Sequence, residues 1–320
     1  MSAAPSPTVS VVIPAYNATD FVGGAVESAL SQTRPPLEVV CVDDGSEDDT
    51  LSYLHRLADL HPGRVRVVAQ ANGGPSSARN RGLAEVTSDY VQFLDADDEL
   101  DRDKFECQIA LALEASDPPD LIVSGYRQLA MDGDEVSTVP IADDVWTGLA
   151  TSRLGITSAN LCRTDAVRTI HGWREDLLTS EDPDLYFRLL ASGARVLLDP
   201  HPRATLRRRP DSQWNQDERR SLEGWVVFRG RLWEHLREHG LDTSERQRAL
   251  EVASFRTLER LASVEGVGRE GGVALLKASG LPTFPHARKQ AYQLLFKAFG
   301  YEKAEALMDV YRSVRGAIGR

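Results

Sequence analysis

The 320-residue sequence is poor in cysteine, with only Cys41, Cys107 and Cys162. Three scattered thiols are too few for a metal cluster or a disulfide framework, so we expect them to stay reduced. No run of about 18 apolar residues could cross a bilayer, and the first ten residues lack the basic and apolar regions of a secretion signal. We therefore expect a soluble, cytoplasmic protein, with peripheral contact at the inner face of a membrane as a further option.

The sequence also lacks a glycine-rich phosphate-binding turn after its first apolar run. That run is followed by PAYN, residues 14–17, in place of G-x-G-x-x-G or a P-loop. The absence argues against hydride transfer with a dinucleotide and against ATP hydrolysis. It also argues against a nucleotidyltransferase, which would need a basic, glycine-rich loop at this point.

Basic residues are outnumbered over most of the chain. Lys and Arg number 37 against 48 Asp and Glu, which gives a formal net charge of −11. Residues 1–200 hold 15 basic and 33 acidic side chains, whereas residues 201–320 hold 22 and 15. The acidic total argues against nucleic-acid binding, and the asymmetry predicts two different functional surfaces.

Short β-branched runs alternate with amphipathic, helix-length segments through the first hundred residues. The expected strands are 8–14, 37–42, 65–69 and 90–94, and the expected helices are 20–32, 48–60 and 76–85. This alternation predicts an α/β fold with a mostly parallel sheet and helices on both faces. Ligands of such sheets bind at the carboxyl ends of the strands, so the residues there are the candidates for chemistry.

Carboxylates crowd the end of the fourth expected strand, in the segment LDADDEL. Their mutual repulsion needs relief from a cation or a hydrogen-bonded sugar. Magnesium or manganese is commonly held by one or two carboxylates together with substrate phosphates. Asp95 and Asp97 are therefore the leading candidate ligands, and Asp98 is a candidate partner. The alternative is that Asp98 only caps the next helix.

A second acidic pair, Asp43 and Asp44, ends the second expected strand before a turn at Gly45. A carboxylate at this place can accept a hydrogen bond from an N–H group of a nucleotide base. The simpler alternative is that one of the two aspartates caps the following helix.

Five motifs, in this order and at these separations, resemble a family 2 glycosyltransferase with the A-type fold. They are VSVVIPAYN, VVCVDDGSEDDT, NGGPSSARNRGL, DYVQFLDADD and SEDPDLYFRLLASG, and they cover about residues 8–200. The resemblance implies an inverting single displacement that moves a hexosyl or N-acetylhexosaminyl group from a nucleotide sugar, with uridine diphosphate favoured. It also implies a manganese or magnesium ion, and a hydroxyl acceptor on a glycan, cell-envelope polymer, lipid-linked or natural-product molecule.

The same resemblance assigns donor contacts residue by residue. The first loop would touch the nucleoside, Asp44 would recognise the base, and the DxD pair would lie at the ribose and the metal. The glycine segment that ends in Arg79 would lie near the ribose and diphosphate. The residues assigned in this way are Pro14, Ala15, Tyr16, Asn17, Asp43, Asp44, Gly73, Gly74, Arg79, Asp95, Ala96 and Asp97.

Glu181 and Asp182 match the family's acidic pair, of which the second member is commonly the catalytic base. Chemistry supports this role, because the acceptor hydroxyl must lose a proton as it attacks the anomeric carbon, and a carboxylate can take that proton. The alternative is that Asp182 only caps the following helix.

The sequence departs from the family pattern near its TLRRRPDSQW segment. Relatives often carry a metal-binding histidine there, whereas this chain has Arg209 at the matching place. Arg207, Arg208 or Arg209 would instead pair with the diphosphate through a guanidinium fork, and the alternative is that this segment is a solvated basic loop. His201 is an alternative metal ligand. On the acceptor side, Trp173 is expected either as a wall for the sugar or as a core aromatic, and Asn160 as a pocket residue.

We divide the chain into a catalytic domain, residues 1–210, and a helical, basic region, residues 211–320. Within the first, nucleotide-sugar binding is expected over about 8–115 and the acceptor side over about 116–210. The basic region is expected to pack as helices on its own domain. The alternatives are a platform for an anionic polymer or lipid-linked acceptor, and a homo-oligomer surface.

A second hypothesis for the whole chain differs in class from an enzyme. The fold could be kept by a catalytically silent nucleotide-sugar binding or scaffold protein. The presence of Asp95, Asp97 and Asp182 together favours the enzyme.

Overall fold

The computed structural model describes residues 6–129, 135–207, 217–264 and 281. The chain divides into two compact units, Met1–Asn215 and Gln216–Arg320. Among the helices that the structure describes, none combines the length and hydropathy of a membrane span.

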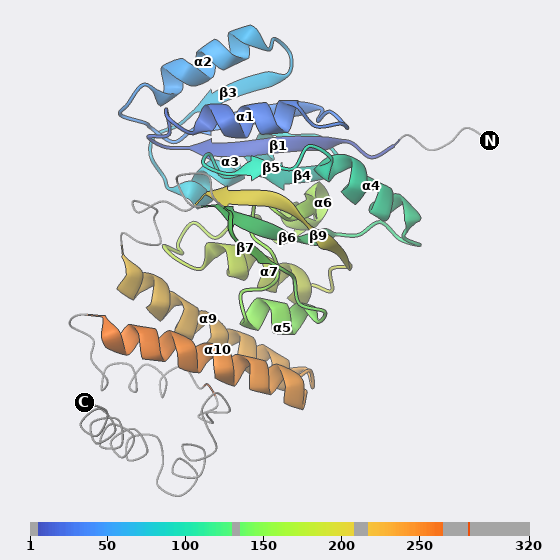
Figure 1. Cartoon of the computed structure of the whole chain (residues 1–320), viewed down its shortest axis with the longest axis vertical. Helices are drawn as coiled ribbons and strands as arrows, with labels where there is room; N and C mark the ends of the chain where they lie inside the picture. The colour runs from blue at the N-terminus through green and yellow to red at the C-terminus, as the bar shows by residue number, and fades with distance from the viewer. Residues whose placement is uncertain (1–5, 130–134, 208–216, 265–280, 282–320) are drawn as a thin grey trace, which may run out of the picture. The chain divides into compact units, whose positions relative to one another are not determined.

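A nine-stranded sheet organises the first unit (Figure 1). Its strands are β1 Val9–Ala15, β2 Glu38–Asp43, β3 Val65–Ala69, β4 Tyr90–Phe93, β5 Glu99–Leu100, β6 Leu121–Leu129, β7 Glu135–Val139, β8 Leu161–Arg163 and β9 Val196–Arg207. The helices of this unit are α1 Val22–Leu30, α2 Thr50–Leu60, α3 Pro75–Glu85, α4 Lys104–Glu114, α5 Val145–Ala150, α6 Thr164–Thr169 and α7 Glu181–Ala191.

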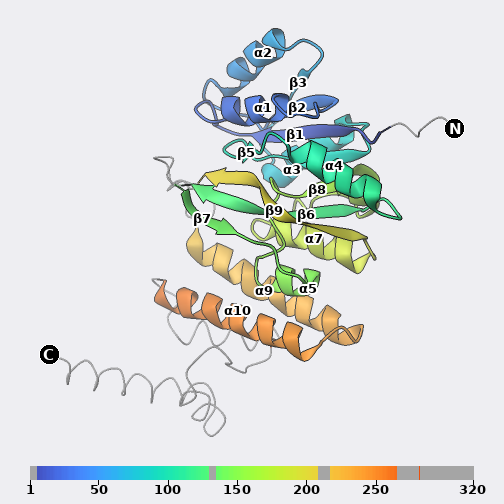
Figure 2. The same cartoon turned by 45° about the vertical axis from the view of Figure 1, so that its right-hand side comes forward.

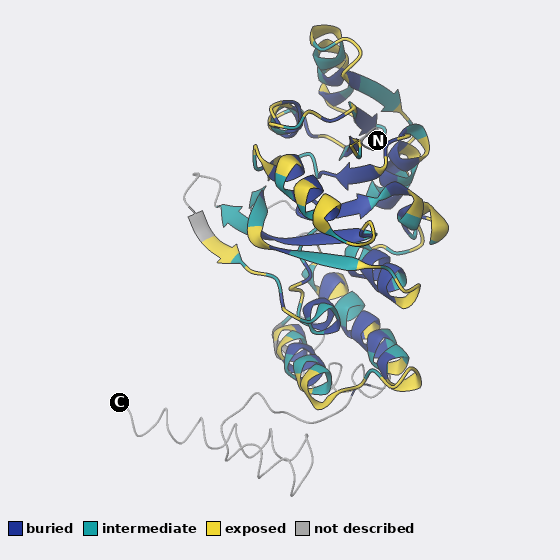
Figure 3. Ribbon diagram, turned by 90° about the vertical axis from the view of Figure 1, so that its right-hand side faces the viewer, coloured by how far each residue is buried: buried dark blue, intermediate teal, exposed yellow. Residues whose placement is uncertain are grey.

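The strands follow the order β3-β2-β1-β4-β8-β6-β9-β5, with β7 paired to β6. The pairs β1–β2, β1–β4, β2–β3 and β6–β9 are parallel, and Figure 2 shows β6 and β9 side by side. Helices lie on both sides of the sheet (Figure 3). The predicted α/β fold class is therefore confirmed.

The central strands are buried on both faces, because helices cover both. Val11, Val12 and Ile13 of β1 are fully buried, as are Val39 to Val42 of β2. Such continuous β-branched runs made these strands predictable, and the four strands and three helices expected in the first hundred residues occur within two residues of their predicted ends.

The middle of the sheet contains an antiparallel strand. β8, only three residues long, pairs antiparallel with β4 on one side and with β6 on the other. It joins the parallel half that carries β1 to β4 to the half built from β6, β9, β5 and β7. The residues that lead into β8 therefore reach the site from the far half of the sheet.

The second unit contains two long described helices, α9 Glu218–Glu238 and α10 Ser244–Ser263. Leu222, Val226, Leu232 and Leu236 repeat at helical spacing on α9 and are buried. Most of the predicted basic region, residues 265–280 and 282–320, lies outside the described residues.

Candidate active site

The loops that follow β1 and β2 are tied together at the carboxyl edge of the sheet. The Asn17 amide donates to Ser46 Oγ over 3.1 Å, and the Glu47 amide donates to Asn17 Oδ1 over 2.8 Å. Asn17 has a φ of 46°, a left-handed conformation that asparagine tolerates better than most residues. Tyr16 next to it is 48% exposed, so its ring is available to a ligand at this edge.

Asp44 organises the glycine loop that precedes α3. Its carboxylate accepts hydrogen bonds from Gln70 Nε2 at 2.8 Å, the Gly73 amide at 2.9 Å and the Gly74 amide at 2.8 Å. Gly74 has a φ of 86°, which a residue with a Cβ adopts only with strain. The loop is thus held in place by a carboxylate on the neighbouring strand end.

Asp43 lies beside Asp44 and keeps one acceptor atom unpaired. Its Oδ2 accepts from the Ser46 amide over 3.2 Å, while its buried Oδ1 has no hydrogen-bond partner among the described residues. Neither aspartate is the cap of α2, whose N-cap residue is Asp49. The expectation that one of the pair caps this helix is therefore wrong, because the helix begins too far along the chain.

The carboxylates after β4 differ in their burial. Asp95 and Asp97 are half-buried, whereas Asp98 is buried and accepts a 2.6 Å hydrogen bond from Ser158 Oγ. Burial, together with the charges of Asp95 and Asp97, raises the pKa of Asp98 well above its usual range. The N-cap residue of α4 is Asp103, so Asp98 belongs to the acidic cluster and does not cap this helix.

Glu181 and Asp182 open α7, immediately after Ser180 in a left-handed conformation. Asp182 lies inside the first turn, so it is not the cap residue. Burial, the largest effect, and the charges of Glu181 and Asp95 raise the pKa of Asp182 to about 7 against the lowering effect of Arg79. Its Oδ1 atom is buried and has no hydrogen-bond partner among the described residues, although the side chain as a whole is 33% exposed.

Arg79 connects these two acidic groups. Its Nη2 atom lies 2.7 Å from Asp95 Oδ1, and its Nη1 atom lies 3.8 Å from both Glu181 Oε1 and Asp182 Oδ1. The structure therefore brings together the first residue of the DxD motif and the acidic pair of α7, which are more than 80 residues apart in sequence. Arg79 itself, expected near the ribose and diphosphate, is only 5% exposed at its side chain.

The segment 157–160 supports both acidic groups, and sequence reasoning identified only its last residue, Asn160. Ser158 Oγ donates to Asp98 and accepts from the Asp95 amide at 3.3 Å, and the Thr157 hydroxyl lowers the pKa of Asp182. Gln92 Nε2 donates to the Thr157 and Ser158 carbonyls. No motif marks a T-S-A-N segment, so only the fold shows that it touches the cluster.

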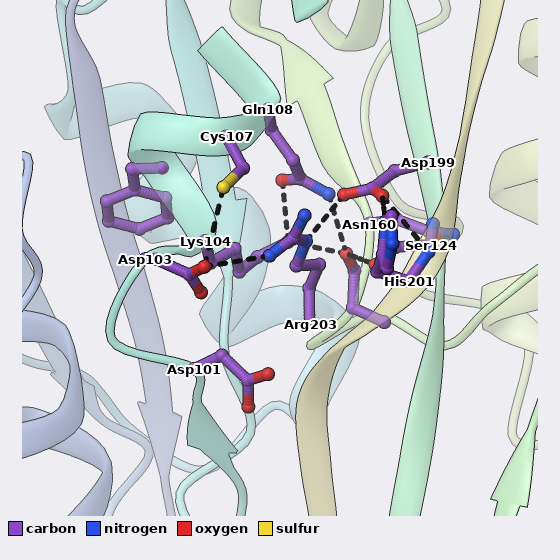
Figure 4. Close-up of polar contacts among 12 residues, drawn as sticks. Asp101, Asp103, Lys104, Cys107, Gln108, Ser124, Asn160, Asp199, His201 and Arg203 are labelled. Carbon is purple, nitrogen blue, oxygen red and sulfur yellow. Dashed lines mark hydrogen bonds and ion pairs between the residues drawn. The ribbon is translucent and has the colours of Figure 1, made fainter. Parts of the chain in front are cut away.

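A buried lysine holds the other side of this segment (Figure 4). Lys104 Nζ donates to the Ala159 carbonyl and, over 2.7 Å, to Gln108 Oε1. Ser124 Oγ donates to the same Ala159 carbonyl at 2.8 Å. Because Lys104 is fully buried, its pKa falls to about 7. Lys104 and Ser124 thus both hold the backbone next to Ser158.

The residues after β4 fit a hard divalent cation. Oxygen ligands suit magnesium and manganese, and the repulsion between Asp95, Asp97 and Asp98 is what a cation would relieve. No three His, Cys, Asp or Glu side chains within the described ranges are placed to hold an ion without further ligands. Donor phosphates commonly complete such a site, so Asp97 and Asp95 remain the candidate ligands.

The two acceptor-side candidates are buried. Trp173 is 2% exposed, with the Arg79 guanidinium 4.4 Å from its ring centroid and Phe93 against it edge-on. Its face is therefore occupied by Arg79 and does not form an open wall for a sugar. Asn160 is also buried, and its side chain donates to the Leu154 carbonyl and accepts from the Ser124 amide. Both side chains therefore pack beneath the site residues and are not open to an acceptor.

The two alternatives for the missing histidine have different outcomes. Arg209 lies outside the described residues. His201 contacts Asp199 at 3.3 Å (Figure 4), whereas the Arg207 amide, at the end of the same strand, reaches Asp98. Six residues of strand span about 20 Å, so His201 is too far away to complete a metal site at Asp97.

Comparison with protein families gives one match to this part of the chain. The model described as Glycosyl transferase family 2 matches residues 10–136. An uncharacterized glycosyltransferase of Escherichia coli strain K12, YibD, is 42% identical over 106 residues, which are 33% of this chain and 30% of YibD. Chondroitin synthase of Escherichia coli is 33% identical over 200 residues, which are 58% of this chain and 27% of that enzyme. The chain thus spans less than a third of the length of either relative.

Two solved structures share the fold at low sequence identity. TarS 1–349 of S. aureus, in complex with UDP-GlcNAc, has a TM-score of 0.68 at 17% identity and covers 96% of this chain and 92% of its own. The mannosyltransferase PcManGT from Pyrobaculum calidifontis, in complex with GDP-Man and Mn²⁺, has a TM-score of 0.54 at 18% identity, with 97% and 81% covered. Both likenesses concern the fold.

Proposed function

Starting from the presence of a glycosyl transferase family 2 domain at residues 10–136, we propose that this chain is an inverting, nucleotide-sugar-dependent glycosyltransferase. Asp182 acts as its general base, and the residues after β1, β2, β3 and β4 bind the donor. The observation that carries this proposal is the convergence of Asp95 and Asp182 on Arg79. It places a donor-side carboxylate and a proton acceptor around one guanidinium.

The reaction is a single displacement. The acceptor hydroxyl oxygen attacks the anomeric carbon while its proton passes to Asp182, and the bond from that carbon to the donor phosphate oxygen breaks. The pKa of Asp182, about 7, makes it a stronger base than an ordinary carboxylate while leaving a useful ionised fraction at neutral pH. Its Oδ1 atom is buried and faces Arg79, so the other carboxylate oxygen, Oδ2, is the candidate proton acceptor.

Negative charge gathers on the diphosphate as it leaves. A divalent cation held by Asp97 and Asp95 would offset this charge as a Lewis acid. Tyr16, Asn17, Asp43 and Asp44 line the neighbouring strand ends, where the nucleoside is expected. Asp43 Oδ1 is a buried acceptor without a described partner, so a base N–H group would satisfy it.

The donor is proposed to be a UDP-sugar, and the acceptor a hydroxyl on a glycan or cell-envelope polymer. The fold shared with TarS in complex with UDP-GlcNAc and the similarity to chondroitin synthase support this choice. Thermal unfolding with a panel of nucleotide sugars, with and without manganese, tests it. A ligand that binds only the folded chain raises the melting temperature. If GDP-mannose stabilises the chain and no UDP-sugar does, the donor assignment is wrong.

Asp182→Asn tests the base. Transfer should fall by about two to four orders of magnitude, because the acceptor hydroxyl keeps its proton, while the donor dissociation constant should change by less than about threefold. Asp165→Asn, at an aspartate whose side chain is 78% exposed on α6, is the matched control and should transfer normally. Retained turnover in Asp182→Asn would remove the base assignment, whereas donor binding without any transfer by the wild-type chain would favour a protein that only binds nucleotide sugars.

A further inference from the structure

Arg79 is fixed firmly by the packing of its own helix. One turn further along α3, Gly82 lies against β1, and a Cβ atom at this position would come within 2.2 Å of Val12 Cγ1. Next to Arg79, Asn80 donates to the Trp173 carbonyl and accepts from the Trp173 amide, at 2.9 and 2.8 Å. The helix and the Trp173 segment therefore hold the guanidinium from two sides.

The guanidinium uses only part of its hydrogen-bonding capacity. Nη2 is paired with Asp95, whereas Nε and Nη1 are buried and have no hydrogen-bond partner among the described residues. The Nη1 atom, 3.8 Å from Glu181 and Asp182, is close enough for electrostatic attraction and too far for a hydrogen bond. The guanidinium also stacks on the Trp173 ring, with Arg79 Cζ 4.4 Å from the ring centroid.

One cation thus faces three carboxylates that come from two separate parts of the chain, the end of β4 and the start of α7. Buried like charges repel strongly unless a fixed opposite charge lies between them. A planar guanidinium can pair with one carboxylate along one edge and still direct its other nitrogen atoms toward a second group. Arg79 has this arrangement, and its low exposure leaves little of it accessible to a diphosphate.

We propose that Arg79 is a positioning residue that joins the donor-side carboxylate Asp95 to the general base Asp182 and supplies the fixed positive charge that faces the Asp182 carboxylate. The inference rests on the proposed function, because it assumes that Asp182 is the base. It differs from the expectation that Arg79 binds the donor diphosphate itself.

The groups around Asp182 define what the loss of Arg79 would do. Glu181 on α7 and Asp95 after β4 raise its pKa, while Arg79 and the Thr157 hydroxyl lower it. The phenol of Tyr186, one turn along α7, also faces Asp182. Arg79 is the cation in this described set. In the metal-free chain, loss of Arg79 would leave desolvation and the two neighbouring carboxylates without an opposing charge near Asp182.

The test follows the Asp182 carboxyl directly, so it does not depend on knowing the donor. In the full chain labelled with ¹³C at aspartate Cγ, the Asp182 signal is assigned by its loss in Asp182→Asn and titrated with pH. Arg79→Met should raise the pKa of Asp182 by about one to three units, and Arg79→Lys should raise it less. Arg81→Met is the matched control, because Arg81 lies on the same helix, is 50% exposed and pairs with Glu85; it should leave the titration unchanged.

A second readout uses transfer of the sugar selected by the thermal panel. In a plot of kcat against pH, the acidic limb should move to higher pH in Arg79→Met, by as much as the pKa of Asp182 rises. In Arg79→Lys it should stay within about half a pH unit of wild type. A merely structural role would lower the melting temperature and leave both the titration and the limb in place, and that result overturns the inference. If Arg79→Met does not fold, Arg79→Gln, which also lacks the positive charge, is titrated against wild type in its place.

The two proposals fail in different ways. Turnover that survives in Asp182→Asn removes the base and with it the proposed mechanism. An Asp182 carboxyl that titrates identically in wild type, Arg79→Met and Arg79→Lys removes only the role of Arg79. A wild-type KM for the nucleotide sugar in Arg79→Met, together with a lowered kcat, would further separate Arg79 from direct donor binding.

Discussion

At the scale of single residues, Asp182 combines the proposed chemistry with an unfavourable effect on folding. Its pKa of about 7 lies above the usual value near 4, so the folded chain holds this proton more tightly than the unfolded chain. The stability linked to the proton is complete below about pH 4, declines as the pH rises, and is lost above about pH 7. At neutral and higher pH, the ionised base therefore destabilises the fold that contains it.

Asp182→Asn should consequently stabilise the chain in a pH-dependent way. We expect a melting temperature a few degrees higher than wild type at pH 8 and the same as wild type at pH 4. The gain should be on the order of 1 kcal/mol, since solvent screens a side chain that is 33% exposed. Thermal unfolding of both chains across this range measures it, and an unchanged difference between pH 4 and pH 8 would contradict the assignment of the pKa.

The acidic residues of the site were predictable one by one because each follows an apolar strand or opens a helix. Asp44, Asp95 and Asp182 all occur at such places. The side chains that contact these acidic residues were not predictable. The segment SSARN, for example, does not indicate whether Arg79 points toward carboxylates or toward solvent. The burial of Trp173 was also open, since an aromatic side chain suits a core and a sugar wall equally well.

At the scale of elements, helix α3 connects the sheet to the site, and its contact with β1 leaves no room at Gly82. Alanine normally favours a helix interior over glycine by about 1 kcal/mol. Here the added methyl group would meet Val12, a stiff, β-branched side chain in a fully buried strand position. The steric effect should outweigh the helix propensity.

Gly82→Ala should therefore lower the free energy of unfolding by about 1–3 kcal/mol. Denaturant unfolding measures the loss, and Val12→Ala in the same chain should recover part of it, because it removes the atoms that the new methyl group meets. Ala84→Gly, at an exposed position on the same helix, is the control for propensity alone. If Gly82→Ala is more stable than wild type, the close packing of α3 on β1 is not as described.

The order of the strands in the sheet was harder to predict than the alternation of strands and helices along the chain, because some strands are very short. The long, apolar strands β1 and β2 carry a clear pattern, whereas β5 has two residues and β8 has three. Segments of this length have no readable period. The antiparallel insertion of β8 depends on its pairing with both neighbours, and that pairing is a property of the assembled sheet.

At the scale of the whole molecule, the described site residues all belong to the first unit, Met1–Asn215. The charge changes from 33 acidic and 15 basic residues in 1–200 to 15 and 22 in 201–320, and residues 216–320 alone hold 14 acidic and 18 basic side chains. We propose that the second unit serves a different ligand. An anionic acceptor would suit its positive balance.

Removal of residues 216–320 should then separate donor chemistry from transfer. We expect the shortened chain to keep donor binding and slow donor hydrolysis within about threefold of the full chain, while transfer to an anionic polymer falls at least about tenfold. Nucleotide release measured with and without acceptor distinguishes the two activities. Equal loss of both in a chain that still unfolds cooperatively would argue against an acceptor role for the second unit.

The insertion of β8 also bears on how this chain acquires its activity during folding. Strands β1 to β4 all end before residue 94, whereas β8 follows its partner β4 by some 70 residues, so the pairing of β8 closes a long loop that the chain cannot close until it has grown past residue 163. Ser158 and Asp182 join Asp95 only after this closure. A growing chain would therefore complete the nucleotide side of its sheet well before it could move a proton, and catalytic competence would be among the last properties to appear.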